Sequence, residues 1–303
     1  MNLLITGIAG FIGSKIALAA IQQGHAVFGV DDLSNGKSIN IPNQCEFLQY
    51  DLANKKIKNY LPKNIDIILH LAGQSSGEIS FDDPINDLQK NVISTLNLIE
   101  YGIKIKAKKI IYASSMSVYG STADRAINEQ EQCQPLSCYG VGKLAAENYL
   151  KIYKNELPFV IFRMFNVYGP GQDLHNLRQG MVSIYLAYAN KSKHIPVKGS
   201  LNRFRDFIFI DDVVDVWLRS LDNQSINNKI FNLGTGVKTT VASLLEQIKS
   251  LYSDINWIEE HNTLGDQFGI YADPTLLIKN FNITKFSSLQ DGLTIFSNWC
   301  KNQ

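Results

Sequence analysis

A glycine-rich turn near the N-terminus most constrains what this chain can fold into. Gly7, Gly10 and Gly13 stand between an apolar run at 2–6, which predicts a buried strand, and a helix-forming run at 14–21. Glycine has no Cβ, so such a turn lets the backbone come close to a ligand. Between a strand and a helix this spacing is typical of a dinucleotide-binding unit, where a pyrophosphate rests on the helix N-terminus.

An acidic residue follows at the distance that such a unit requires. The apolar run at 26–30 predicts a second strand, and Asp31 stands at its end, 18 residues after Gly13. A carboxylate at this place accepts hydrogen bonds from a ribose 2′-hydroxyl and repels a 2′-phosphate. We therefore expect NAD as the cofactor rather than NADP.

The alternation of strands and helices continues to about residue 168. Further strands are expected at 45–50, 65–72, 109–113 and 159–163, and helices at 84–102 and 137–154. This alternation predicts an α/β fold with a doubly wound parallel sheet of the Rossmann type. Ligands of such sheets bind at the carboxyl ends of the strands. The residues expected there are Asp31, Asp51, Ala72, Gly73, Ser114, Ser115, Phe165 and Asn166.

The pattern changes after residue 168. Helices are expected at 182–189, 212–221 and 240–251, and strands at 204–210 and 230–233. We expect a NAD-binding Rossmann domain over 1–168, which also receives roughly 205–235. A smaller α/β substrate-binding domain is expected over 169–303, interleaved with the first.

A pair of side chains in the predicted helix at 137–154 is a candidate for catalysis. Tyr139 and Lys143 are four residues apart, so on a helix they share a face. A neighbouring ammonium favours the phenolate form of tyrosine, and a phenolate is a general base for a hydroxyl proton. Such pairs also occur by chance in many helices, so the rest of the chain must supply the site.

Composition excludes several classes of protein. The formal net charge of +1 gives no field that would favour nucleic acid or an anionic membrane, and no run of eighteen or more apolar residues exists to span one. The four cysteines, Cys45, Cys133, Cys138 and Cys300, lack the spacing of a metal site. We expect reduced thiols, a cytoplasmic protein and no metal.

Taken together and in this order, the motifs resemble those of the extended short-chain dehydrogenase/reductases, and within them the nucleotide-sugar epimerases of the UDP-glucose 4-epimerase type. The resemblance covers nearly the whole chain. The matching stretches are 6–13, 31–36, 70–73, Asn91, 114–120, Tyr139 with Lys143, 163–170, 205–207, 232–236, 265–266 and 272–273.

The resemblance implies a role for individual residues. Tyr139 would be the base, Lys143 its partner and a ligand of the nicotinamide ribose, and Ser115 the hydroxyl that bonds the substrate oxygen at C4. The other implied cofactor contacts are Gly7, Gly10, Phe11, Ile12, Gly13, Asp31, Asp32, Ser34, Asn35, Asp51, Leu52, Leu71, Ala72, Gly73, Asn91, Ser114 and Phe165. The implied substrate contacts are Ser75, Ser117, Asn166, Arg205 and Asp266. Arg205 suits a diphosphate on chemical grounds, although an ion pair with Asp206 or Asp211 would be an ordinary alternative.

The serine segment separates the reaction types within this family. Related 4,6-dehydratases carry Asp-Glu where this chain has Met116 and Ser117, and the decarboxylases carry Glu at the second position. Neither Met116 nor Ser117 can act as a carboxylate acid or base. The resemblance therefore implies an NAD-dependent nucleotide-sugar 4-epimerase acting on a UDP-hexose or UDP-N-acetylhexosamine. A 4-keto nucleotide-sugar reductase using NAD(P)H, and a non-catalytic dinucleotide-binding protein, remain as alternatives.

Three further expectations follow from the resemblance. Family members often carry a phosphate-binding arginine where this chain has Thr263, so either the diphosphate is bound more weakly or Arg203 or Arg178 supplies the second cation. A homodimer would form through the helices at 84–102 and 137–154, although the apolar stripe of the first is equally explained by packing on its own sheet. A role in polysaccharide biosynthesis follows from the substrate class alone.

Overall fold

The chain folds around a seven-stranded parallel sheet. The computed structural model describes residues 1–261 and 265–303, so Thr263 lies outside the described residues. In spatial order the strands are β3 (Glu46–Gln49), β2 (Ala26–Asp31), β1 (Asn2–Thr6), β4 (Ile67–His70), β5 (Lys109–Ser115), β6 (Phe159–Met164) and β11 (Lys229–Leu233). The order reverses between β1 and β4, as in a doubly wound fold, and the predicted fold class is confirmed.

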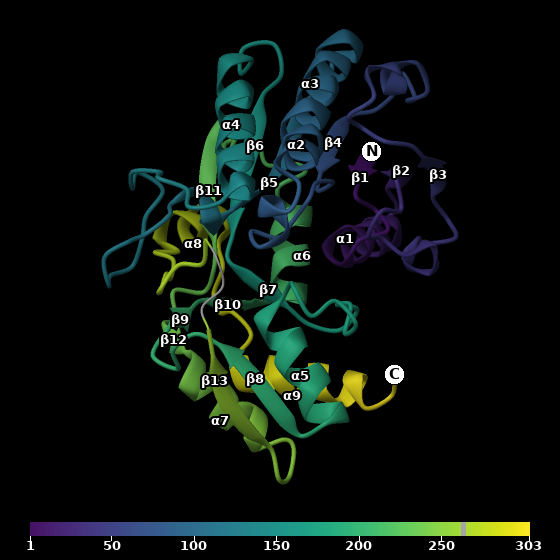
Figure 1. Cartoon of the computed structure of the whole chain (residues 1–303). Coiled ribbons are helices and arrows are strands. Elements are labelled where there is room, and N and C mark those ends of the chain that lie inside the picture. The colour runs from purple at the N-terminus through teal and green to yellow at the C-terminus, as the bar shows by residue number, and fades with distance from the viewer. Residues whose placement is uncertain (262–264) are drawn as a thin grey trace.

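Helices cover both faces of this sheet (Figure 1). Helices α1 (Phe11–Gln22) and α6 (Ile210–Arg219) lie on one face, and α3 (Ser94–Ile105) and α4 (Cys138–Ile152) lie on the other. Successive side chains of a strand point to opposite faces, so Leu3 packs with α1 and Leu4 packs with α3. Burial on both faces explains why these strands are continuous apolar runs.

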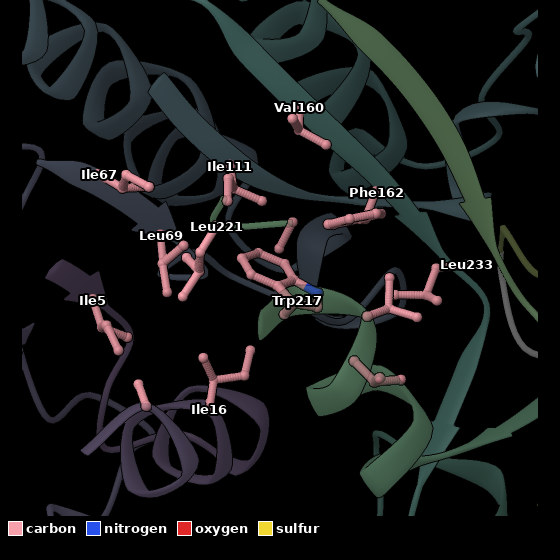
Figure 2. Packing of buried hydrophobic residues seen from close by; sticks show 14 of the residues in the cluster. Ile5, Ile16, Ile67, Leu69, Ile111, Val160, Phe162, Trp217, Leu221 and Leu233 are labelled. Carbon is pink, nitrogen blue, oxygen red and sulfur yellow. The ribbon is translucent and has the colours of Figure 1, made fainter. Parts of the chain in front are cut away.

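Trp217 of α6 is the largest fully buried side chain of the first face. Its ring centroid lies 5.4 Å from that of Phe162 on β6, and Figure 2 shows it among the aliphatic side chains of the central strands. This packing fixes α6 beside α1, although nearly two hundred residues separate them in the sequence. A late segment of the chain also completes the sheet, since strand β11 pairs with β6.

A smaller α/β region lies beyond the carboxyl end of the sheet, at the lower end of Figure 1. It contains helices α5 (Met181–Lys191), α7 (Val241–Lys249) and α9 (Leu289–Cys300) and the parallel pair β8 (His194–Lys198) and β13 (Asn256–Glu260). Helix α8 (Thr275–Phe281) instead packs on the Trp217 side of the sheet. The sequence did not predict β8, β13, α8 or α9. The division into two domains with the bounds given above stays a prediction.

The predicted strand at 204–210 is wrong as a single element. It forms β9 (Phe204–Arg205), antiparallel to β12 (Thr239–Thr240), and β10 (Phe207–Phe209), parallel to β7 (Asn166–Tyr168). The break falls at Asp206, which is fully buried. Its carboxylate accepts hydrogen bonds from the backbone N–H groups of Thr235, Gly236 and Ala272. The ladder is interrupted where this side chain binds two loops, one at 235–236 and one at 272.

The predicted helix at 84–102 is also not uniform. It consists of α2 (Pro84–Leu88), a π-helical turn at Gln89–Ile93, and α3. A π turn is wider than an α-helical turn and occurs mostly at functional sites. Within the described ranges, no helix combines the length and the apolar character needed to cross a membrane.

Candidate active site

The glycine turn between β1 and α1 is built for close approach. Gly7 has φ +70°, and a Cβ atom on Gly13 would lie 2.1 Å from the carbonyl oxygen of Gly7. Gly10 is the N-cap of α1 and offers no side-chain cap, so the N–H groups of the first turn face outward for a ligand. These features leave an anion-binding helix terminus at the carboxyl edge of the sheet.

This turn opens into a cavity of about 790 Å³, which we call the Gly7 cleft. Most of the predicted cofactor contacts line it. They come from the carboxyl ends of β1, β2, β3 and β4 with the segments that follow these strands, and from α4. These are Gly7, Gly10, Phe11, Ile12, Gly13, Asp31, Asp32, Ser34, Asn35, Asp51, Leu52, Leu71, Ala72, Gly73, Tyr139 and Lys143. A cavity of this size and lining fits a dinucleotide.

Three predicted cofactor contacts lie elsewhere. Ser114 and Phe165 line a neighbouring cavity instead. Asn91 is 1 % exposed and lies behind Gly73, since a Cβ atom on that glycine would be 2.5 Å from the Asn91 Oδ1 atom. The amide nitrogen of Asn91 donates to Asp87 at 3.2 Å, and its Oδ1 has no hydrogen-bond partner within the described residues.

The acidic end of the Gly7 cleft contains a cation that the sequence analysis missed. Asp31 accepts from the backbone N–H groups of Ala9 at 3.0 Å and Leu33 at 2.9 Å, and burial raises its pKa. Lys90 forms ion pairs with Asp32 at 2.6 Å and Asp51 at 2.9 Å. No sequence motif indicated Lys90, because only the π turn directs it toward this end of the cleft.

Helix α4 presents the predicted pair as expected. Ser137 is its N-cap and accepts from the backbone N–H of Gly140 at 3.1 Å. Lys143 donates to the carbonyl oxygen of Ala113 at 3.0 Å, and its Nζ atom lies 5.7 Å from the centroid of the Tyr139 ring. Tyr139 lines both cavities, so its side chain belongs to the wall that they share.

The protonation of this pair differs from the expectation. Burial raises the pKa of Tyr139 to about 12, and contact with Ser115 acts in the opposite direction. Burial also lowers the pKa of Lys143 to about 8, against the charges of Asp87 and Glu147. The prediction that Lys143 holds Tyr139 near its ionised form is therefore wrong for the protein alone, because loss of solvent outweighs the neighbouring ammonium.

The second cavity, of about 510 Å³, is here called the Arg205 cleft. It adjoins the Gly7 cleft at Phe11, Ile12, Ser75 and Tyr139, which line both. All the predicted substrate contacts line it: Ser75, Ser117, Asn166, Arg205 and Asp266, together with Ser115. The hydroxyl of Ser115 lies 3.1 Å from that of Ser117, so the two hydroxyls are adjacent beside Tyr139.

Two buried arginines share one carboxylate in this second cleft. Arg205 and Arg203 are 2 % and 6 % exposed, and each pairs with a different oxygen of Asp266. The alternative of a surface ion pair with Asp206 or Asp211 is wrong for Arg205. Asp266 neutralises only one of the two guanidinium charges. The cleft therefore keeps a positive charge that can attract an anion. Arg203 was named in the sequence only as a replacement cation.

The remaining carboxylates of the Arg205 cleft are few. Among the described lining residues they are Glu78, Glu260 and Asp266. Glu78 pairs with Arg178 at 3.1 Å and Lys198 at 3.2 Å. Met116 and Ser117 occupy the positions beside Ser115, as expected, and neither is acidic. Within the described ranges, no group of three or more His, Cys, Asp or Glu side chains is placed to hold a metal ion.

A network of buried ionic side chains supports helix α4, which carries Tyr139 and Lys143. The hydroxyl of Ser114 donates to Glu147 at 2.6 Å, and Arg163 donates to both oxygens of the same carboxylate, at 3.0 and 2.7 Å. Glu147 lies one turn beyond Lys143 on α4, and Arg163 lies on β6. The network fixes α4 against the ends of β5 and β6, a role that the sequence did not reveal.

The fold and these two clefts define a dinucleotide-binding enzyme of the Rossmann type, with a second cleft that contains two arginines beside a tyrosine. Comparison with known proteins leads to the same class of protein. The model of the NAD dependent epimerase/dehydratase family matches residues 3–234, and the chain belongs to this family. The protein is accordingly NAD-dependent, and the glycine cradle and Asp31 fit that cofactor.

Three similar proteins illustrate the range of the family. The UDP-glucose 4-epimerase of Mycolicibacterium smegmatis is 35% identical over 80% of this chain and 80% of its own. The structure of the Thermotoga maritima UDP-glucose 4-epimerase with UDP-glucose is 31% identical, covers 100% of this chain and 99% of its own, and superposes with a TM-score of 0.95. The dTDP-D-glucose 4,6-dehydratase of Homo sapiens is 27% identical over 84% of this chain and 75% of its own.

Proposed function

We propose that this protein is an NAD-dependent nucleotide-sugar 4-epimerase that acts through a transient 4-keto sugar. One observation carries the proposal. Tyr139 lies on the wall between the Gly7 cleft and the Arg205 cleft, beside the Ser115 hydroxyl. A sugar in the Arg205 cleft would therefore meet a base, a hydrogen-bonding hydroxyl and the nicotinamide end of the first cleft at one carbon.

The proposed roles of the side chains follow from this placement. Residues of the Gly7 cleft, among them Gly7, Asp31 and Lys143, would hold NAD, which would supply the hydride acceptor and donor for C4 of the sugar. Tyr139 takes the proton of the C4 hydroxyl and gives it back, while Ser115 bonds to the same oxygen. Lys143 keeps a positive charge close to the phenol, which opposes the effect of burial on its pKa.

The unbalanced charge of Arg203 and Arg205 supports a diphosphate in the second cleft. Guanidinium groups pair well with phosphate oxygens, and anchoring the diphosphate leaves the sugar free to turn over after oxidation. We propose a UDP-hexose or UDP-N-acetylhexosamine as substrate, since the similar epimerases named above act on, or are bound to, UDP-glucose.

Epimerisation is favoured over elimination by the residues beside Ser115. A 4,6-dehydratase needs an acid and a base near C5 and C6, whereas Met116 and Ser117 supply neither. Of the described carboxylates of the cleft, Asp266 and Glu78 are already paired with cations. The protein resembles dehydratases in fold, but it carries no carboxylate at the two positions that follow Ser115.

The test is turnover with a panel of UDP-glucose, UDP-N-acetylglucosamine and their C4 epimers, followed by chromatography. An epimerase interconverts at least one pair and consumes no added NADH. A 4-keto reductase, the second candidate, uses the same residues but consumes one NAD(P)H for each product. Failure to interconvert any pair with NAD bound would refute the proposal.

A homodimer is proposed through α2 and α4. Ile85 and Leu88 of α2 and Val141 and Ile152 of α4 are exposed apolar side chains, between 47 % and 69 % accessible. Burying them against a second copy would remove apolar surface from water. Sedimentation of the wild type and of Ile152→Glu distinguishes a dimer from a monomer.

A further inference from the structure

Lys90 connects two carboxylates at the acidic end of the Gly7 cleft. Its Nζ atom lies 2.6 Å from Asp32 Oδ2 and 2.9 Å from Asp51 Oδ2. Asp32 directly follows β2, and Asp51 stands just after β3, so one side chain joins the ends of two neighbouring strands to the helix layer. All three residues line the cleft.

The backbone that carries Lys90 is the π turn at 89–93. Lys90 and Asn91 are consecutive in this turn, yet only Lys90 lines the cleft. Lys90 reaches the two acids, whereas Asn91 lies behind Gly73, on the side of Lys143. The turn therefore places a charged side chain in a position that a uniform helix pattern does not indicate.

The ionic bridge is stable in its charged form. Burial disfavours charge on Asp32 and on Lys90, but their mutual hydrogen bond and the Asp32 bond to Ser34 reverse this effect for the acid, so its pKa is lowered. The pKa of Lys90 is raised, because its bonds to Asp32 and Asp51 outweigh the cost of burial. The side chains of Lys90 and Asp32 are only 21% and 23% exposed.

We propose that Lys90 determines the cofactor selectivity of the Gly7 cleft. Bound by two carboxylates, its ammonium is not available to the 2′-phosphate of NADP. By holding the Asp32 and Asp51 side chains in place, it presents them to the hydroxyl groups of the adenosine. Asp31 and Asp32 would then repel a 2′-phosphate, because all of these groups carry negative charge. Removing Asp32 would leave the ammonium paired with Asp51 alone, so that it could also bind a phosphate.

The experiment measures binding of NADH and NADPH to protein freed of bound dinucleotide, by calorimetry. Lys90→Met should weaken NADH at least fivefold. Asp32→Asn should lower the ratio of the NADPH to the NADH dissociation constant by about tenfold or more, because one charge-assisted hydrogen bond is gained and one repulsion lost. Asp32→Asn with Lys90→Met should lose most of that shift.

Lys108→Met is the matched control. Lys108 pairs with Asp66 at 2.9 Å at the amino ends of β4 and β5, away from the Gly7 cleft. This variant should therefore bind both dinucleotides as the wild type does. The proposal is overturned if Asp32→Asn shifts the ratio equally with and without Lys90, or if Lys90→Met changes NADH affinity by less than twofold. The measurement needs no sugar nucleotide, so it stands apart from the outcome for the proposed epimerase.

Discussion

The Nζ atom of Lys143 lies 5.7 Å from the centroid of the Tyr139 ring, one helical turn away on α4. Both side chains are buried, and burial acts on them in opposite directions: the pKa of Tyr139 is raised to about 12 and that of Lys143 is lowered to about 8. At neutral pH the protein alone therefore holds a neutral phenol beside an ammonium. Tyr139 must therefore lose its own proton before it can accept one from the substrate. Further positive charge nearby would favour that loss, and an oxidised nicotinamide ring would supply such a charge.

Replacing Tyr139 with phenylalanine should lower kcat by about 10²- to 10⁴-fold, the usual contribution of a positioned acid–base group. Affinity for NADH should stay close to that of the wild type, because the ring still fills the wall between the clefts. Tyr149→Phe is the control, since Tyr149 is also on α4 but is 37 % exposed and lines neither cleft. Turnover of Tyr139→Phe above a tenth of the wild-type value would mean that another group is the base.

Asp87 should make stability depend on pH. Burial raises the pKa of this carboxyl to about 6, although Asn91 and Lys143 act in the other direction. The folded protein thus binds a proton more tightly than the unfolded chain, so stability falls as pH rises from about 4 to 6. In the Asp87→Asn variant this fall in stability between pH 4 and pH 6 is absent. The free energy of unfolding of the variant relative to wild type should be larger above pH 7 than at pH 4, by on the order of 1–3 kcal/mol.

Urea unfolding of wild type and Asp87→Asn at pH 4 and pH 8 measures that difference, and the comparison cancels the titrating groups that do not interact with Asp87. A difference in unfolding free energy that is the same at both pH values would contradict the shifted pKa.

Removing the charge of Glu147 should destabilise the fold strongly. Arg163 is 3 % exposed and loses its bidentate partner in Glu147→Gln, which leaves a buried guanidinium without a counter-charge. Breaking such pairs typically costs about 3–5 kcal/mol. Lys151→Met removes only a 3.8 Å contact of a partly exposed lysine with the same carboxylate and should cost less than about 1 kcal/mol. Equal midpoints in denaturant for the two variants would refute this assignment.

Arg205→Gln should weaken UDP by about 10- to 100-fold, the value of a charge-assisted hydrogen bond. Uridine, which lacks the diphosphate, should bind both proteins alike. Arg125→Gln, which removes an exposed ion pair with Glu131 far from the clefts, is the matched control. Calorimetry with the two ligands decides the matter. An equal loss for UDP and uridine would show that Arg205 supports the cleft wall without contacting phosphate.

Local patterns sufficed for the elements of the first half of the chain. The strand at 2–6, the glycine turn and the helix with Tyr139 and Lys143 were predictable because apolar runs, glycine spacing and helix periodicity act over a few residues. The broken strand at 204–210 was not predictable, since the break depends on Asp206 bonding to loops near 235 and 272. The short strands β8 and β13 were missed for the same reason, because each is stabilised by pairing with the other, which is distant in the sequence.

By itself, the sequence determined that a dinucleotide would bind at a parallel sheet, that Tyr139 and Lys143 would share a helix face, and that Met116 and Ser117 would offer no carboxylate. Only the tertiary structure decided that Lys90 bridges Asp32 and Asp51, that Arg203 and Arg205 share Asp266, and that Tyr139 is a neutral phenol in the protein alone. The reason is physical: periodicity and spacing are local, whereas burial and ion pairing depend on which distant segments exclude water from a given side chain.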